Sequence, residues 1–434
     1  MDQALGGVFL IVVMLALLAG GVWVAFSLLG VAWLAFALFT SAPILKVLPT
    51  TVWSIAASWP LTALPLFIWM GEILFRTRLA ADMFRGLEPW LTRLPGRHLH
   101  VNVLACGIFA AVCGSSAATA ATIGRMTLSE LETRGYNRRL SLGSLAASGS
   151  LGMLIPPSIV MIVYGITAEV SIARLFIAGV IPGLVLMALF MSYIMLWSVA
   201  HPSAHRSDDK RFTWRESFIA SRSLMPILLL IVAVIGSIYG GIATPTEAAV
   251  VGVVGSLAIA YATGGLTRRS FIESLTATTR TSCMIMFILV AAAFLTAAMG
   301  FLGTPKQMGA WISAMKLGPY ELIAILIMFY IVLGCFLDGI SMIVLTMAVV
   351  VPAVQAVGID LVWFGIFVVI VIEMSQITPP VGFNLFVVQS LTGTDIIEVA
   401  RASMPFFLLM IVLVVLITVF PEIVTFLPRT MTHG

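Results

Sequence analysis

Long runs of apolar residues, separated by short polar segments, dominate the pattern of this chain. Most runs are about 17 to 25 residues long, which an α-helix needs to cross a hydrocarbon core of roughly 30 Å. The sequence therefore predicts an all-α integral membrane protein with about ten transmembrane helices. The first two runs are joined only by Gly20 and Gly21, so they form either two short helices or one long kinked segment. The predicted crossings are 5–18, 21–39, 53–75, 143–168, 170–200, 223–242, 245–263, 281–302, 361–390 and 404–427.

The apolar stretch 99–124 does not fit a simple crossing, because both of its flanks are rich in arginine. Five arginines precede it within 76–97, and four follow it within 125–139. Positive loops lie on the cytoplasmic side, so the stretch enters and leaves the membrane by one face. We predict a re-entrant hairpin whose tip lies near Cys113–Ser116. Such irregular backbone is tolerated at membrane depth only where protein or a water-filled cavity surrounds it.

A second apolar stretch, 319–355, does not fit a simple crossing either, and it has no arginine-rich flanks. Carrying the predicted crossings forward places both of its ends outside the cell, so it is a second re-entrant hairpin entering from the opposite face. In this topology 18 of the 23 Lys and Arg residues lie in cytoplasmic loops. A topology shifted by one crossing would reverse that bias.

The composition agrees with the membrane class and narrows the function. Of 434 residues, 61% are apolar and 10% are charged, whereas a soluble domain has about 25% charged residues. The net charge of +4 comes from short loops between apolar runs, so it indicates topology rather than nucleic-acid binding. The N-terminus has no positive region before its apolar run, so we expect no removable signal peptide.

The chain contains an internal repeat with an offset of 223 residues. Its two Pro-Pro pairs, Pro156-Pro157 and Pro379-Pro380, are separated by this distance, and each is followed 26 residues after its first proline by another proline. The same offset superposes the two predicted hairpins and places Ser115 against Asp338. We therefore predict a first repeat over 1–200, a cytoplasmic linker over 201–222 and a second repeat over 223–434.

Equivalent loops of the two repeats differ in charge. The arginine-rich loop 76–97 corresponds to 299–320, which holds only Lys306 and Lys316. Conversely, three arginines within 268–280 correspond to a loop that holds only Lys46. Equivalent loops thus face opposite sides of the membrane, which is typical of the inverted-topology repeats of secondary transporters.

Four segments break the predicted helices with glycine, proline and small polar residues, two in each repeat. Proline removes a backbone donor and glycine permits a turn, so carbonyl groups become free near the membrane midplane. Ser and Thr hydroxyls add further oxygen ligands, which suit a hard cation such as Na⁺. Helix N-termini that point into the same space suit a carboxylate. The segments are Gly114–Ser116, Ser148–Ser158, Gly334–Gly339 and Gln376–Asn384.

Each segment also has a structural explanation, such as close helix packing for the small residues or simple kinks for the prolines. Asp338 favours the functional explanation over the structural one, because a carboxylate inside an apolar stretch is costly and usually has a functional role. Glu373 also lies within a predicted crossing but has no irregular neighbour, so we interpret it as structural or interfacial. Glu247 belongs to Thr244-Pro-Thr-Glu247, the pattern of a capped helix start, and we assign it no role in binding.

Five motifs, spread over nearly the whole chain, resemble the large membrane subunit of tripartite ATP-independent periplasmic (TRAP) transporters. They are CGSSAATAA at 113–121, RGYN at 134–137, GSLGMLIPPS at 149–158, ATPTEAA at 243–249 and QITPPVGFN at 376–384. One departure concerns substrate: some sialic-acid members carry a basic residue before the second hairpin, and this chain has none between Cys283 and Pro305. Sialate is therefore disfavoured.

The resemblance implies a multi-pass protein of the bacterial inner membrane that imports an organic acid with Na⁺ as coupling ion and no cofactor. It implies an elevator mechanism and two partners, a separate small four-helix membrane subunit and a periplasmic substrate-binding protein. Substrate-binding residues would be Ser115, Ser116, Asp338 and Asn384. Sodium sites, with no other metal, would involve Gly114, Ser115, Gly149, Pro156, Gly334, Asp338, Gly339, Thr378 and Pro379.

Two alternatives stay open. A stand-alone Na⁺/dicarboxylate symporter with the same two hairpins would need no binding protein. An intramembrane serine hydrolase using Ser115 or Ser116 would need a general base, but all five histidines fall in polar loops or at the terminus and the apolar spans contain no lysine. We therefore expect a transporter rather than an enzyme.

Overall fold

The computed structural model describes residues 3–40, 42–201, 212–303, 315, 317–334, 336–380 and 382–431. Every regular element in these ranges is a helix, which confirms the all-α prediction. Lys306, Lys316 and residues 202–211 of the predicted linker lie outside the described residues.

The first repeat contains two separate N-terminal helices rather than one kinked segment. Gly21 has a φ of 76°, and the chain reverses there so that α1 and α2 pack against each other. The elements of this half are α1 (Gln3–Ala19), α2 (Val24–Phe39), α3 (Ile44–Ala56), η1 (Trp59–Thr62), α4 (Ala63–Phe75), α5 (Leu79–Leu91), α6 (Leu99–Cys113), α7 (Ser116–Thr133), α8 (Arg138–Gly149), α9 (Leu151–Leu154), α10 (Ile159–Thr167) and α11 (Ile172–Ala200).

The second half begins with a short helix inside the predicted linker. A capping box between Thr213 and Glu216 starts this helix, and its side packs against α5. The elements are α12 (Trp214–Ser221), α13 (Met225–Tyr239), α14 (Pro245–Ala262), α15 (Arg268–Phe301), α17 (Pro319–Gly334), α18 (Gly339–Ala356), α19 (Leu361–Gln376), α20 (Phe383–Thr392), α21 (Ile396–Val419) and α22 (Glu422–Arg429). Glu247 caps α14 as expected.

Several predicted crossings are broken helices. Within the described residues, five helices are long and apolar enough to cross a membrane, or up to eight spans if each bent pair counts as one. The predicted crossing 143–168 consists of α8, α9 and α10, with a bend of 42°. The predicted crossing 361–390 likewise consists of α19 and α20, separated by 377–382.

Helix boundaries recur at the 223-residue offset. Shifted by this offset, Ser116–Thr133 becomes 339–356, which are the bounds of α18. The caps repeat as well: Asn137 Oδ1 accepts a hydrogen bond from the Leu140 amide (3.1 Å), and Asp360 Oδ1 accepts one from the Trp363 amide (2.9 Å). Both Pro–Pro bonds are cis.

Contacts between the halves occur in reciprocal pairs. Helix α2 packs on α15 while its counterpart α14 packs on α4, and α7 packs on α20 while its counterpart α18 packs on α10. Such reciprocity is the property of a two-fold relation between the repeats. Together with the opposite charges of equivalent loops, it supports an inverted repeat.

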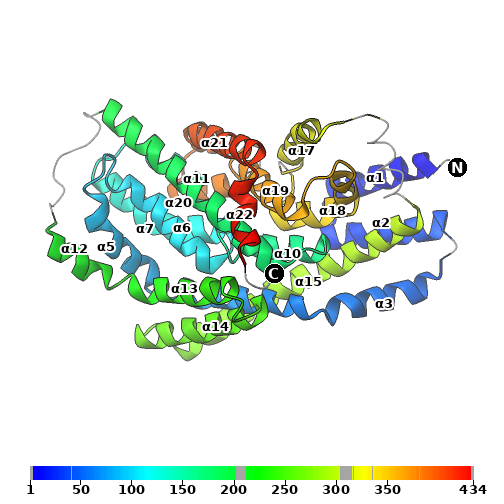
Figure 1. Ribbon diagram of the computed structural model, residues 1–434, viewed down its shortest axis with the longest axis horizontal. Coiled ribbons are helices and arrows are strands. Elements are labelled where there is room, and N and C mark those ends of the chain that lie inside the picture. The colour runs from blue at the N-terminus through cyan, green and yellow to red at the C-terminus, as the bar shows by residue number, and fades with distance from the viewer. Residues whose placement is uncertain are drawn as a thin grey trace.

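Apart from α5 and α12, the helices form two groups that both repeats build jointly (Figure 1). One group contains α1–α4 and α13–α15, and the other contains α6–α11 and α17–α22, where both hairpins and both broken helices lie. Contacts of α4 with α6 and of α15 with α18 connect the groups. The hairpins are thus held in one body by helices from both halves.

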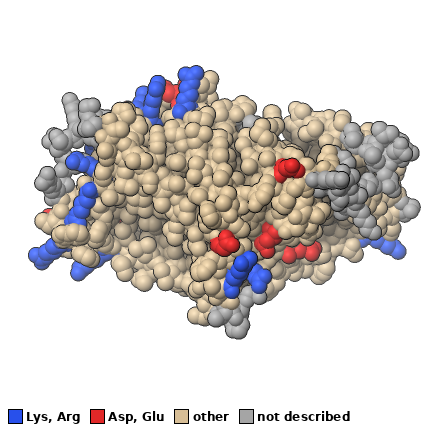
Figure 2. Space-filling view, turned by 45° about the horizontal axis from the view of Figure 1, so that its top comes forward, with Lys and Arg blue, Asp and Glu red and all other residues tan. Residues whose placement is uncertain are grey.

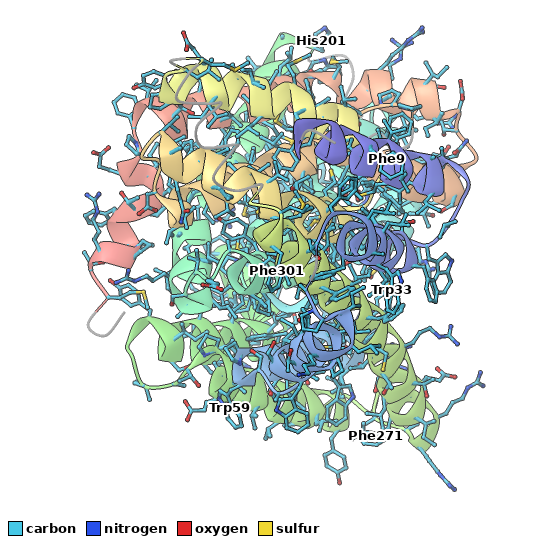
Figure 3. All side chains as sticks on the ribbon, turned by 90° about the vertical axis from the view of Figure 1, so that its right-hand side faces the viewer. Phe9, Trp33, Trp59, His201, Phe271 and Phe301 are labelled. Atoms are coloured by element: carbon cyan, nitrogen blue, oxygen red, sulfur yellow. The ribbon has the colours of Figure 1, made fainter. Side chains whose placement is uncertain are left out.

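The surface is that of a protein surrounded by lipid. Figure 2 shows a wide uncharged zone, with Lys and Arg gathered mainly toward the left-hand end, where α5 and α12 lie in Figure 1. The aromatic side chains Phe9, Trp33 and Trp59 point outward (Figure 3) and are 40%, 46% and 70% exposed. Exposed apolar area on this scale matches a hydrocarbon environment.

The base of the first hairpin contains a buried polar cluster that the sequence did not indicate. His98 and His100, expected in polar loops, are 1% and 0% exposed at the start of α6. The His98 ring contacts Tyr136 Oη (3.0 Å) and Glu88 Oε1 (3.0 Å), and Arg134 binds the same carboxylate (2.9 Å). Hydrogen bonding from His98, aided by Arg134, lowers the pKa of Glu88. This cluster fastens α5 to both hairpin helices.

Packing between α8 and α21 predicts a strong effect of adding one methyl group. A Cβ on Gly143 would lie 2.1 Å from the Ala402 carbonyl oxygen, which is backbone and cannot move alone. We expect Gly143→Ala to destabilise the protein by about 1–3 kcal/mol or more. Gly300→Ala is the matched control, because nothing lies within 4 Å of its added Cβ. Melting temperatures in detergent test this, and equal values for both variants would contradict the packing.

Candidate functional site

The tip of the first hairpin is a sharp break between α6 and α7. Gly114 closes α6 with a φ of 64°, Ser115 is extended, and α7 begins at Ser116. A Cβ on Gly114 would lie 2.9 Å from the Pro157 carbonyl oxygen, so a larger residue would be strained and crowded there. The tip therefore packs directly against the first broken helix, which consists of α8, α9 and α10.

The first broken helix also comes close to the tip through Gly152. A Cβ on Gly152 would lie 2.7 Å from the Ser115 carbonyl oxygen and 2.7 Å from the Ser116 amide nitrogen. Pro156 and Pro157 are buried, and Ser158 Oγ accepts a hydrogen bond from the Met161 amide at the start of α10 (3.4 Å). This break is an interior feature of the protein.

The tip of the second hairpin lies between α17 and α18, and Asp338 is the N-cap of α18 there. Its Oδ2 accepts hydrogen bonds from the amides of Ile340 (3.1 Å) and Ser341 (3.4 Å), and the Ser341 hydroxyl donates to Oδ1. Gly334 packs against Ser375, because an added Cβ would lie 2.1 Å from the Ser375 hydroxyl. The carboxylate is half-buried at a positive helix end, an environment that stabilises negative charge.

The second broken helix is more open than the first. Pro379 and Pro380 are exposed, and Thr378 Oγ1 donates to the carbonyls of Met374 and Ser375. Asn384, at the start of α20, is fully buried, and its Nδ2 donates to the Ala146 carbonyl of α8 (3.3 Å). Asn384 thus connects the second break to the first.

Glu373, interpreted from sequence as structural or interfacial, meets the first tip. Its side chain is 1% exposed, and its Oε1 accepts hydrogen bonds from Ser116 Oγ (2.6 Å) and from the Met153 amide (3.1 Å). These donors belong to the first hairpin and the first broken helix, more than 200 residues away. A lone carboxylate within the run 361–377 was the available signal, but its partners could not be read from the sequence.

Unsatisfied polar atoms concentrate on the same helices. Buried side-chain atoms normally have hydrogen-bond partners, so a group without them indicates a site for water, an ion or a ligand. Five such atoms in the described part of the chain lie on α7, α8, α19 and α20. They are Thr119 Oγ1, Ser148 Oγ, Glu373 Oε2, Gln376 Nε2 and Asn384 Oδ1.

The predicted residues form two neighbourhoods. Ser115, Ser116, Gly149 and Asn384 lie around the first tip, where a Cβ on Gly149 would be 3.5 Å from Asn384 Nδ2. Asp338 instead lines a cavity of about 1030 Å³ between α1, α2, α15 and the second hairpin. Phe383, next to Asn384, also lines this cavity and lies between the two neighbourhoods.

A family model described as "Tripartite ATP-independent periplasmic transporter, DctM component" matches residues 11–423. The chain belongs to this family. It is a TRAP large permease, a multi-pass protein of the bacterial inner membrane.

Individual relatives agree with this membership. The TRAP large permease is 33% identical over 382 residues to the C4-dicarboxylate TRAP transporter large permease protein DctM of Rhodobacter capsulatus, covering 85% of this chain and 86% of the relative. It is 32% identical to the isethionate TRAP transporter permease protein DctMQ of Oleidesulfovibrio alaskensis, covering 85% of this chain and 58% of the relative. The YdaH transporter of Alcanivorax borkumensis has a similar fold, with a TM-score of 0.64 at 14% identity over 92% of this chain and 97% of that one.

Proposed function

We propose that this TRAP large permease imports a small organic acid with Na⁺ as the coupling ion, after a periplasmic binding protein delivers the substrate. The observation that carries the proposal is the gathering of both hairpin tips and both broken helices in one helix group. Free carbonyls, hydroxyls and a carboxylate at such breaks suit a hard cation, and helix N-termini suit an anion.

Substrate class follows from chemistry and from the relatives. The relatives are named for C4-dicarboxylates and isethionate, which are small acids that carry negative charge. The N-termini of α7 and α18, one from each hairpin, offer positive helix ends for such groups. We expect Ser115, Ser116, Asp338 and Asn384 to contact substrate.

The two helix groups support elevator transport. Both tips and both breaks belong to one group, so a rigid displacement of this group would carry the whole site without dismantling it. We expect Na⁺ to occupy sites built from Gly114, Ser115, Gly149 and Pro156 in the first half and from a further set of residues in the second half. That remaining set is Gly334, Asp338, Gly339, Thr378 and Pro379.

Reconstituted uptake tests the tripartite proposal. We expect proteoliposomes that contain this chain with the small membrane subunit to accumulate radiolabelled succinate only when the binding protein and an inward Na⁺ gradient are both supplied. The family and the DctMQ relative, in which this chain covers 58% of a longer permease, support a second membrane component. Full-rate uptake of free succinate by this chain alone would indicate the stand-alone symporter instead, and uptake without a Na⁺ gradient would contradict the coupling.

A further inference from the structure

Glu373 joins three elements that the proposed transport cycle must hold in register. It lies on α19 of the second repeat, while its two donors, Ser116 Oγ and the Met153 amide, belong to the first hairpin and the first broken helix. Met153 also faces the second tip, since a Cβ on Gly339 would lie 3.2 Å from its sulfur. Met153 thus lies between the two hairpin tips, and Glu373 binds its amide.

This contact is not a requirement of the fold, because the repeat does not reproduce it. Shifted by 223 residues, Glu373 corresponds to Ser150 and Ser116 corresponds to Gly339. Ser150 Oγ donates to the Ala147 carbonyl of its own helix (2.6 Å), and Gly339 has no side chain. Both repeats have the same fold, but only one of them has the carboxyl. The carboxyl therefore has a role that is specific to the first tip.

The surroundings favour the uncharged acid. Glu373 Oε2 is buried without a hydrogen-bond partner, and no described Lys, Arg or His forms an ion pair with the carboxyl. An unpaired buried carboxylate costs several kcal/mol, so a protonated group is favoured. In that form the carbonyl oxygen accepts both donors and the hydroxyl is carried by the other oxygen.

We propose that Glu373 is a positioning residue whose uncharged carboxyl holds the first hairpin tip against the first broken helix and α19. This inference deepens the proposed function, because the tip it holds bears Ser115 and Ser116. Loss of the acceptor frees Ser116 Oγ and leaves the Met153 amide only its longer hydrogen bond to the Ser150 carbonyl (3.4 Å), and the tip then samples other positions. Cation binding at the tip weakens as a result.

Two substitutions separate the acceptor from the charge. Glu373→Gln keeps an acceptor oxygen at the same place without any charge, whereas Glu373→Met keeps the length and loses the acceptor. We expect hydrogen exchange at the Met153 amide to be unchanged in Glu373→Gln and about tenfold faster in Glu373→Met, because the amide loses the shorter of its two hydrogen bonds, a loss of about 1.4 kcal/mol. Glu398→Met, at an exposed glutamate on α21, is the matched control.

Sodium-dependent thermal stabilisation in detergent, with choline chloride as the reference salt, provides the second readout. We expect the Na⁺ concentration for half-maximal stabilisation to rise about tenfold in Glu373→Met, to stay within twofold in Glu373→Gln and to rise less in Ser116→Ala. Ser403→Ala, which removes a buried hydroxyl bonded within α21, controls for the loss of a serine.

The outcomes distinguish this inference from the proposed function. Exchange at Met153 that is equal in Glu373→Met and the wild type would overturn the positioning role. Defects of the same size in Glu373→Gln and Glu373→Met would also overturn it, because charge rather than an acceptor would then be required. A wild-type protein that Na⁺ does not stabilise would contradict sodium coupling, while the exchange measurement would still decide the role of Glu373.

Discussion

Replacing Asp338 with asparagine is expected to reduce Na⁺-driven uptake to a small residual rate while leaving the protein folded. Asparagine caps a helix as well as aspartate does, so its oxygen keeps the hydrogen bonds from the α18 amides, while the charge is lost and the Ser341 hydroxyl must accept from the new amide nitrogen instead of donating. Asp338 is the one charged residue among the described residues that line the cavity of about 1030 Å³ at the second tip. We expect the uptake rate to fall roughly 100-fold, which corresponds to about 3 kcal/mol.

The control is Asp360→Asn, which changes a second aspartate N-cap that lies outside the predicted site. Asp360 Oδ1 accepts a hydrogen bond from the Trp363 amide (2.9 Å), and the equivalent residue of the first repeat is already an asparagine, Asn137. Uptake by this variant should match the wild type. If Asp338→Asn also transports normally with Na⁺, Asp338 is only a helix cap and its assignment to the site is wrong.

Gly152→Ala is expected to reduce uptake about tenfold or more without preventing folding. The added Cβ would lie 2.7 Å from backbone atoms of Ser115 and Ser116, so either the hairpin tip or α9 must shift by several tenths of an ångström. A displaced site loses much of its rate even when every residue is present. Uptake by proteoliposomes and the melting temperature of the same preparation together measure the effect.

Gly236→Ala on α13 is the control for adding a methyl group to a helical glycine. Its Cβ would meet only a Val232 methyl group at 3.8 Å, an ordinary contact. We expect this variant to transport as the wild type does. Normal uptake by Gly152→Ala would show that the first tip does not need its position on the broken helix.

Local chemistry predicted the breaks of this fold well. Glycine, small residues and flanking arginines all indicate a tip at Gly114, and Pro156-Pro157 and Pro379-Pro380 indicate the broken helices. These signals are contained in a few consecutive residues. The repeat was found for the same reason, since two proline pairs fix an offset without knowledge of any contact.

Long-range partners could not be predicted in this way. Glu373 contacts Ser116 across 257 residues, and nothing in the run around it specifies which helix it faces. His98 was placed in a polar loop because its neighbours are polar, but Glu88, Arg134 and Tyr136 surround it in the folded protein. Apolar periodicity locates a helix in the membrane, whereas the neighbours of a helix depend on the whole chain.

The reciprocal packing of the repeats has a consequence for biosynthesis. Helix α21 covers α8, and α20 covers α7. The packing around the first hairpin therefore cannot be completed until the end of the chain has been synthesised. About 250 residues separate α8 from α21, and at about 5–20 residues per second their synthesis takes on the order of 10 to 50 seconds. During that interval the small polar residues of α7 and α8 have no partner from the second repeat. The nascent protein therefore depends on the insertion machinery or on its own early helices to keep these surfaces away from lipid.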